Sequence, residues 1–376
     1  MNILGFNPSH HSSVCLLEDG EIKYFIEDER ISKSKYGLLP FKTITDIIKN
    51  TSIDFYTWGT PSIYYLTDSC TKYISDSYWI DLFFSYGHQK SVDVDFSYKY
   101  HHLLHASNAF YNSGFTKSLS VVIDGMGSLS SIQNSNIPGE MIEVRETETI
   151  YECSYPNNFK VINKNLTHTD TTISIARSYE AITGYLGWSN NEAGKTMGLF
   201  SYGKPNHNIP DMLMYLDYNR GVFKDDPKHF VPHAVLDSEK NPQLKLQTDP
   251  KEWHHNESKI TNLEKDLAWK VQNDTQQKVG DYIEKSIQET GLNQVCCAGG
   301  YFLNCVANYY LTKRFPDVEF YFEPIANDAG TAIGAAKLIW HTETKDMTIR
   351  PLKSLYLGKQ YSKEELLEGI KNYTND

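Results

Sequence analysis

Residues 3–27 read ILGFNPSHHSSVCLLEDGEIKYFIE and give the first indication of the fold. The pattern predicts an apolar strand, a polar loop, a second strand, a tight turn and a third strand. Asp-Gly between two apolar runs is a strong hairpin signal, so the last two strands are predicted to be antiparallel neighbours. The five segments are Ile3–Phe6, Asn7–Ser13, Val14–Glu18, Asp19-Gly20 and Glu21–Glu27.

A similar arrangement returns at LSVVIDGMGSLSSIQ, residues 119–133. An apolar strand runs into the glycine-rich loop Asp124–Ser128, and another strand is predicted after it. One strand-loop-strand unit in each half of the chain suggests an internal structural duplication. Helical patterns separate and follow these units, so the sequence predicts a layered α/β architecture.

The last third alternates strands and helices. Strand pattern at Gln294–Ala298 is followed by Gly299-Gly300, the helical stretch FLNCVANYYLTKRF, the strand VEFYFEPI and then NDAGTAIGAAKLIW. Each strand therefore delivers a glycine or an acidic residue to the start of a helix. In α/β folds this is where ligand sites usually lie.

Composition excludes several classes of protein. A chain of 376 residues can bury a large core, and its net charge of −11 comes without a Lys or Arg run typical of nucleic-acid arms or membrane patches. The N-terminus lacks the pattern of a secretory signal, and no apolar run approaches ~18 residues. Six cysteines without zinc-ribbon spacing are expected to be reduced thiols. We therefore predict a soluble cytoplasmic protein with no membrane partner.

Two histidines, His101 and His105, stand four residues apart in a predicted helix. At this spacing both side chains leave the same face and can reach one ion. A zinc protease would need glutamate after the first histidine, but His102 stands there. Taken alone, such a pair is more often a packing or surface feature than a metal site.

Two aspartates strengthen the metal hypothesis. Asp124 and Asp328 each end a predicted strand, and buried acids there are costly unless they hold a cation or accept backbone hydrogen bonds. The simpler alternatives are a turn residue at Asp124 and a helix N-cap at Asp328. Two histidines and two aspartates together form a mixed nitrogen and oxygen set, which suits Fe(II), Mn(II) or Mg(II) better than structural zinc.

Three glycine-bearing loops form a second group of candidates. Glycine lets backbone N–H groups approach phosphate oxygens closely, and Lys195 adds a cation. None of the loops is a P-loop or a Rossmann fingerprint, but three of them beside element ends point to nucleotide binding. The polar loop between the first two predicted strands carries histidines. A loop histidine is usually solvated, yet one facing a nucleotide site can act as general base. The residues are Asp124–Ser128, Gly194–Gly198, Gly299-Gly300 and the pair His10-His11.

In these motifs the chain resembles the O-carbamoyltransferase family of nodulation-factor and antibiotic biosynthesis. The catalytic domain of that family is similar to the threonylcarbamoyl-adenosine tRNA transferase. The resemblance implies a duplicated actin-like (ASKHA) fold of two βββαβα-type halves, with the nucleotide and metal site in the cleft between them. We expect halves at 1–118 and 119–345, and a segment 346–376 that leads towards a missing adenylate-forming domain. The matching stretches are LGFNPSHHSSVCLLEDGEI, EDERISKSK, HHLLHASNAFYNSGF, VVIDGMGS, SYEAITGYLGW, NNEAGKTMGLFSYGKP, AGGYFLNCVANYYL and PIANDAGTAIGAA.

The resemblance also implies roles for individual residues. His101, His105, Asp124 and Asp328 match the metal ligands, with Fe(II) favoured and Mn or Mg as alternatives, and His10 matches the general base. The family usually has His-Asp where this chain has His10-His11, so either imidazole could be the base. The residues that match the family's nucleotide-binding positions are Lys195, Gly198, Gly299, Gly300 and Asn304. The loop argument above adds Gly125, Gly127 and Ser128 to the expected nucleotide-binding residues.

The reaction implied by the resemblance moves a carbamoyl group from carbamoyl adenylate, made from carbamoyl phosphate and ATP, to a hydroxyl. The acceptor is either a sugar or natural product, or a hydroxymethyl pyrimidine in a nucleotide or a DNA base. The donor would be made by a C-terminal adenylate-forming domain that is either deleted or a separate polypeptide. A further expected partner is a second copy of the chain, in a homodimer. Two alternatives with the same fold are a non-catalytic nucleotide-binding module and a sugar kinase.

Overall fold

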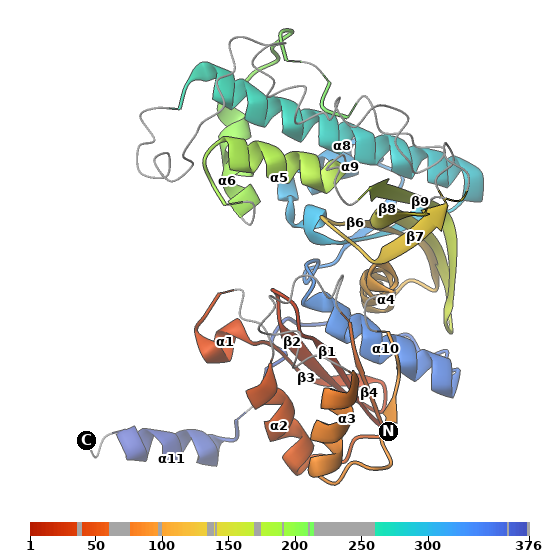
Figure 1. The fold of residues 1–376 in the computed structure, drawn as a ribbon, viewed down its shortest axis with the longest axis vertical. Helices are drawn as coiled ribbons and strands as arrows, with labels where there is room; N and C mark the ends of the chain where they lie inside the picture. Colours follow the sequence, from red (N-terminus) through yellow and green to blue (C-terminus); the bar gives the residue numbers. More distant parts are fainter. Residues whose placement is uncertain are drawn as a thin grey trace.

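The computed structural model describes residues 1–35, 40–59, 76–96, 100–133, 139, 141–168, 174–189, 192–209, 211–213, 260–358 and 361–373. The chain forms two halves, each built on one sheet (Figure 1). The first sheet has the order β3-β2-β1-β4-β5 and confirms the three predicted N-terminal strands. Its strands are β1 (Asn2–Asn7), β2 (Ser13–Glu18), β3 (Glu21–Glu27), β4 (Phe55–Trp58) and β5 (Val92–Asp93).

The second sheet repeats the first. Strand β6 is antiparallel to β8 and parallel to β10, as β1 is antiparallel to β2 and parallel to β4. Strands β9 and β11 extend the two sides as β3 and β5 do. The duplicated actin-like fold expected from the sequence is therefore confirmed. The strands are β6 (Lys117–Ile123), β8 (Met141–Ser154), β9 (Asn158–His168), β10 (Gln294–Ala298) and β11 (Glu319–Phe322).

The strand predicted after the glycine-rich loop is present as β7 (Leu129–Gln133), but it does not form a hairpin with β6. Both strands pair with β8: Ile123 lies opposite Glu148, and Leu129 lies opposite Arg145. They follow one another along β8 because the loop between them is hydrogen-bonded to β8 through backbone groups at both ends. β6 and β7 thus lie end to end along one side of β8, with the loop between them, and β8 is the antiparallel partner of both strands.

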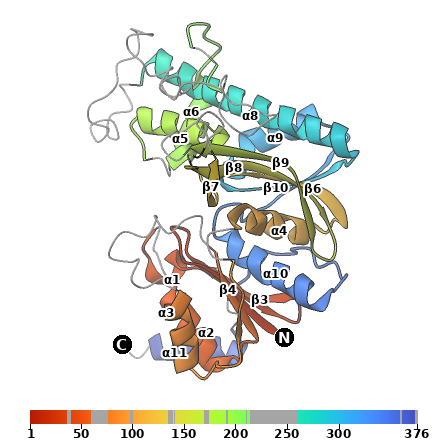
Figure 2. The same ribbon diagram turned by 45° about the vertical axis from the view of Figure 1, so that its right-hand side comes forward.

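Two helices lie between the sheets (Figure 2). Helix α4 (His101–Ser113) follows the first sheet in sequence but packs on β6 and β10 of the second. Helix α10 (Gly330–Thr344) follows the second sheet but packs on β1 and β2 of the first. The two helices also pack on each other, so each half contributes a helix to the other half's core.

Further helices cover the outer faces of the two sheets. Helix α2 (Phe41–Asn50) and helix α3 (Asp76–Ser85) cover the first sheet. The second is covered by α5 (Ile175–Tyr185), α8 (Asn262–Thr290) and α9 (Cys305–Arg314). The short helices α1 (Glu29–Ser32) and α6 (Ala193–Leu199) lie on opposite sides of the gap between the halves (Figure 1).

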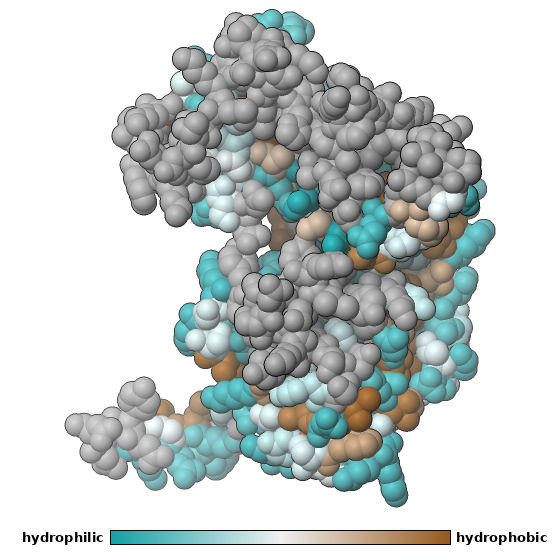
Figure 3. Space-filling view, viewed as in Figure 1, coloured by the Kyte–Doolittle hydropathy of each residue, from teal (hydrophilic) through white to brown (hydrophobic). Residues whose placement is uncertain are grey.

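The surface is hollowed between the halves, where a cavity lies (Figure 3). Helix α11 (Lys363–Tyr373) extends away from the body near the C-terminus (Figure 1). Within the described part of the chain, every helix is too short or too polar to cross a lipid bilayer.

Candidate active site

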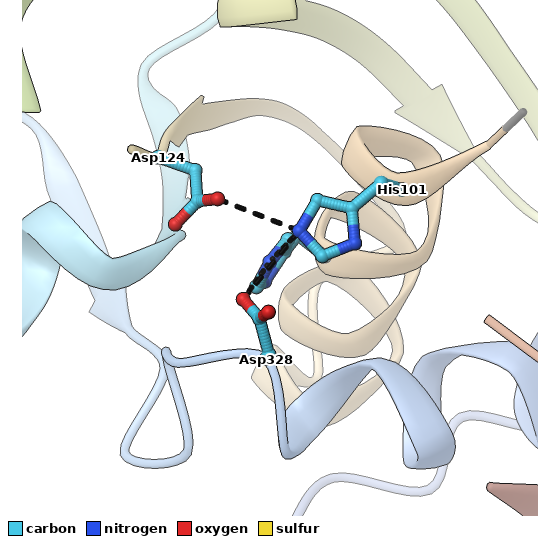
Figure 4. Close-up of side chains that lie close together, drawn as sticks. His101, Asp124 and Asp328 are labelled. Carbon is cyan, nitrogen blue, oxygen red and sulfur yellow. Dashed lines mark hydrogen bonds and ion pairs between the residues drawn. The ribbon is translucent and has the colours of Figure 1, made fainter. Parts of the chain in front are cut away.

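Four of the predicted residues meet at the centre of the molecule. His101 and His105 lie on α4, Asp124 follows β6, and Asp328 lies just before α10. Figure 4 shows His101, Asp124 and Asp328 pointing towards one another. One donor atom from each of the four residues lies within 4.8 Å of the others, and all four are buried. We call His101, His105, Asp124 and Asp328 the quartet.

The distances within the quartet are short. Nε2 of His101 lies 3.4 Å from Oδ2 of Asp124 and 3.5 Å from Oδ1 of Asp328. Nε2 of His105 lies 3.5 Å from the same Asp328 oxygen and 3.1 Å from Nε2 of His101. Donors about 3 Å apart have the spacing of neighbouring ligands around a divalent ion with bonds of about 2.1 Å. The geometry and the mixed donor set therefore fit one such cation.

The two aspartates present their carboxylates to the quartet in different ways. Oδ1 of Asp124 accepts a hydrogen bond from the Gly300 backbone N–H at 3.0 Å, which leaves Oδ2 facing His101. The side chain of Asp328 makes no cap hydrogen bond to α10, whose N-cap is Ala329. The alternative reading of Asp328 as a helix N-cap is therefore wrong, because its carboxylate is turned into the quartet.

The electrostatics of the quartet also favour a bound cation. Burial raises the pKa of Asp124 and Asp328, but the adjacent histidines outweigh it and hold both values well below the usual range. Burial lowers the pKa of His101, but Asp328 and Asp124 raise it to about 10. The two buried carboxylates therefore need positive charge beside them, and a divalent cation would supply it in place of a proton on His101.

A cavity of about 730 Å³ opens beside the quartet, between the two halves. The first half contributes the loop between β1 and β2, and the second half contributes the glycine turns and α5. Seven of the predicted site residues line the cavity. They are His10, His11, Asp124, Gly125, Gly300, Asn304 and Asp328.

Three predicted residues of the glycine turns lie behind the cavity wall. Gly127 packs so closely on His102 that a Cβ would come within 2.5 Å of its Nε2. The hydroxyl of Ser128 accepts a hydrogen bond from the His101 backbone N–H at 3.0 Å. Gly299 has φ of +93°, and a Cβ there would lie 2.3 Å from the Ile123 carbonyl oxygen. These residues shape the turn that carries Asp124.

Of the remaining nucleotide candidates, Lys195 and Gly198 lie on α6 outside the cavity lining, and Asn304 serves a helix. Lys195 is half exposed and pairs with Glu192 at 2.6 Å, while Gly198 has open space around it. The Asn304 side chain caps α9, since its Oδ1 accepts from the Ala307 backbone N–H at 3.0 Å. Its amide nitrogen donates to Gln272, so the side chain is committed to protein contacts.

The two loop histidines face the cavity together. Nδ1 of His10 lies 3.7 Å from Oδ2 of Asp328, and the two imidazole rings contact each other at 4.4 Å between centroids. Burial lowers the pKa of His11, which keeps that imidazole neutral and able to accept a proton. His102 instead turns away from the quartet towards Thr149, 2.8 Å from its Nδ1, and burial lowers its pKa to about 4.

Sequence reasoning missed two charged residues of the cavity wall. Arg177 and Glu180 lie one turn apart on α5, and their side chains pair at 2.8 Å. Burial is the main cause that raises the pKa of Glu180. In the sequence, an i, i+3 charge pair is indistinguishable from the many pairs that lie on solvated helix faces. Only the packing of α5 against the glycine turn reveals their position, since a Cβ on Gly125 would lie 2.8 Å from the Glu180 carboxylate.

The fold and the site define a two-lobed α/β protein with a polar cleft and a buried nitrogen and oxygen donor set. The family model described as "Carbamoyltransferase N-terminus" matches residues 65–337 of the chain. The chain belongs to this carbamoyltransferase family.

Similar curated proteins include two nodulation proteins. NolNO of Sinorhizobium fredii is 23% identical, and the match covers 96% of this chain and 50% of that protein. NolO of Bradyrhizobium diazoefficiens is 25% identical, with 71% of this chain and 43% of that protein covered. An uncharacterized protein of Synechocystis is 29% identical, with 71% and 40% covered. The chain thus spans about half or less of the length of these relatives.

Among solved structures, full-length HypF in its phosphate- and nucleotide-bound form superposes with a TM-score of 0.48 at 14% identity. The superposition covers 91% of this chain and 56% of HypF.

Proposed function

We propose that the chain is the transfer domain of an O-carbamoyltransferase, which moves a carbamoyl group from carbamoyl adenylate to an acceptor hydroxyl. The observation that carries the proposal is the cavity itself, because two carboxylates of the quartet and the imidazoles of His10 and His11 line the same space. A phosphate-gripping cation and a proton acceptor are the two groups that this transfer requires. Membership of the family supports the carbamoyl group as the cargo.

The quartet would hold Fe(II), or Mn or Mg in its place, through the two Nε2 atoms and the two carboxylates. When bound, the ion supplies positive charge to the nucleotide phosphate and so makes AMP a better leaving group. Gly125 lines the same cavity, and its backbone N–H would donate to a phosphate oxygen, whereas the Gly300 N–H already donates to Asp124. Glu180, with Arg177 beside it, lines the same cavity and would accept hydrogen bonds from nucleotide hydroxyls.

The transfer then needs one proton to move. His10 or His11 accepts the proton of the acceptor hydroxyl as its oxygen attacks the carbamoyl carbon. A carbon–oxygen bond to the acceptor forms, the bond between the carbamoyl carbon and the phosphate oxygen breaks, and AMP departs with the electron pair. The carbamoyl adenylate would be made from carbamoyl phosphate and ATP by a further domain or polypeptide. The acceptor would be a sugar or natural product, or a hydroxymethyl pyrimidine.

The test supplies the chain with carbamoyl phosphate, ATP, Fe(II) and an adenylate-forming partner domain, and mass spectrometry then looks for a carbamoyl group on a panel of alcohols. Removing the base should lower the rate by about a hundredfold or more. His10→Ala and His11→Ala are compared with His207→Ala, since His207 is exposed and lies outside the cavity lining. Wild-type rates in both loop variants would exclude the base assignment. Release of ADP instead of AMP would favour the sugar kinase alternative.

Metal content tests the quartet separately. Purified protein should retain a divalent metal, measured by elemental analysis, and His101→Ala and Asp328→Asn should lose it. Removing one ligand of a four-residue set should weaken binding by about tenfold to a hundredfold or more. Equal metal content in wild type and both variants would exclude the quartet as the binding site.

A further inference from the structure

Asp328 uses its two carboxylate oxygens on different partners. Oδ1 faces the quartet, 3.5 Å from the Nε2 atoms of both histidines. Oδ2 accepts a hydrogen bond from the Ser9 hydroxyl at 3.3 Å and lies 3.7 Å from Nδ1 of His10. The carboxylate thus stands between the quartet and the loop that carries the two imidazoles.

The loop between β1 and β2 is tied to this aspartate at further points. The Asn7 side chain donates to the backbone carbonyl oxygens of Asp328 at 3.0 Å and His11 at 3.2 Å. Its Oδ1 accepts from the Ser9 backbone N–H at 2.9 Å. Asn7 and Ser9 are completely buried. The loop conformation is therefore linked to the position of Asp328 by buried hydrogen bonds.

We infer that Ser9 is a positioning residue that couples occupation of the quartet to the placement of the His10-His11 loop. The inference rests on the proposed metal site. A cation that draws Oδ1 of Asp328 into its coordination fixes the orientation of the whole carboxylate. Oδ2 then holds Ser9 in one place, and the loop follows through Asn7. The imidazoles are thereby set in the cavity when the ion that grips the phosphate is bound.

Ser12 provides a matched control within the same loop. Its hydroxyl is buried like that of Ser9, but among the described residues it has no hydrogen-bond partner. Ser12→Ala and Ser9→Ala therefore remove the same group from the same loop. Only Ser9→Ala breaks the contact with Asp328.

The experiment measures hydrogen exchange of the backbone amides of Asn7 and residues 9–13 with and without Mn²⁺, in wild type and both variants. Mn²⁺ should protect the loop in wild type and in Ser12→Ala. A hydrogen bond to a carboxylate changes an equilibrium constant by about tenfold. The protection factor that Mn²⁺ adds to the loop amides should therefore be about tenfold smaller in Ser9→Ala than in wild type. By reciprocity, Ser9→Ala should also bind Mn²⁺ about tenfold more weakly in calorimetry.

Two results would overturn the coupling. One is a wild-type loop whose exchange is the same with and without Mn²⁺, which remains decisive if Ser9→Ala does not fold. The other is a Ser9→Ala protein that responds to Mn²⁺ as Ser12→Ala does. Neither measurement uses a carbamoyl donor, so failure of carbamoyl transfer would overturn the proposed function and leave this result standing.

Discussion

Replacing Gly334 by alanine tests whether the contact between α4 and α10 holds the quartet together. Gly334 lies where the two helices cross, and a Cβ there would lie 2.0 Å from the backbone oxygen of Leu104 and 2.8 Å from Oγ of Ser107. Ordinary contact begins at 3.4 Å, so the α4 backbone would have to retreat by about 1.4 Å. Leu104 immediately precedes His105, so this displacement reaches the quartet directly.

The displacement is large compared with what a metal site tolerates. Ligand distances in such sites hold to within about 0.2 Å, so we expect Gly334→Ala to weaken Mn²⁺ binding by at least about tenfold. Overpacking should also lower the free energy of unfolding by about 1 to 3 kcal/mol, after alanine's higher helix propensity offsets part of the cost. Calorimetry of Mn²⁺ binding and urea denaturation measure the two effects.

Gly369→Ala is the matched control, because Gly369 also lies in a helix and has nothing within 4 Å of its Cβ position. It should bind Mn²⁺ as wild type does and should not be destabilised. If Gly334→Ala matched this control in both assays, the reasoning that α4 and α10 set the quartet distances would be refuted.

Two further predictions concern buried polar residues. Burial lowers the pKa of Lys337 to about 8, so between that value and its ordinary 10.5 the unfolded chain binds more protons. The free energy of unfolding of wild type should therefore rise by about 2 kcal/mol from pH 8 to pH 10 relative to Lys337→Met, and parallel urea titrations would contradict this. Oε1 of Gln272 accepts from Tyr179 at 2.9 Å and from Asn304 at 2.8 Å. Because Tyr179 and Asn304 line the cavity, Gln272→Leu should lower the free energy of unfolding by about 2 kcal/mol or more and weaken nucleotide binding measured by fluorescence. Gln277→Leu, exposed on the same helix, should change neither quantity. Equal behaviour of the two variants would show that Gln272 does not hold these cavity residues in place.

Local sequence patterns were sufficient for much of the fold. The Asp19-Gly20 turn between apolar runs predicts the hairpin that the structure contains, and the spacing of His101 and His105 places both imidazoles on one face of α4. These features depend on neighbours within about one turn of the chain. The repeated strand-loop-strand unit also suggested a duplication, and strand-end position suggested Asp124 and Asp328 as partners of the two histidines. The actin-like arrangement and the match of these four residues to one metal site came from a resemblance carried by motifs distributed along the chain.

The tertiary structure alone decided how these pieces meet. Each half places its last helix on the other half's sheet, and Gly334 lets α4 and α10 approach closely beside the quartet. Local pattern could not show that β7 continues β6 along β8, since pairing is chosen between distant segments. The contact of Ser9 with Asp328 likewise joins opposite ends of the chain. This hydrogen bond can form only after packing of the core has brought the two segments together, so no local sequence pattern predicts it.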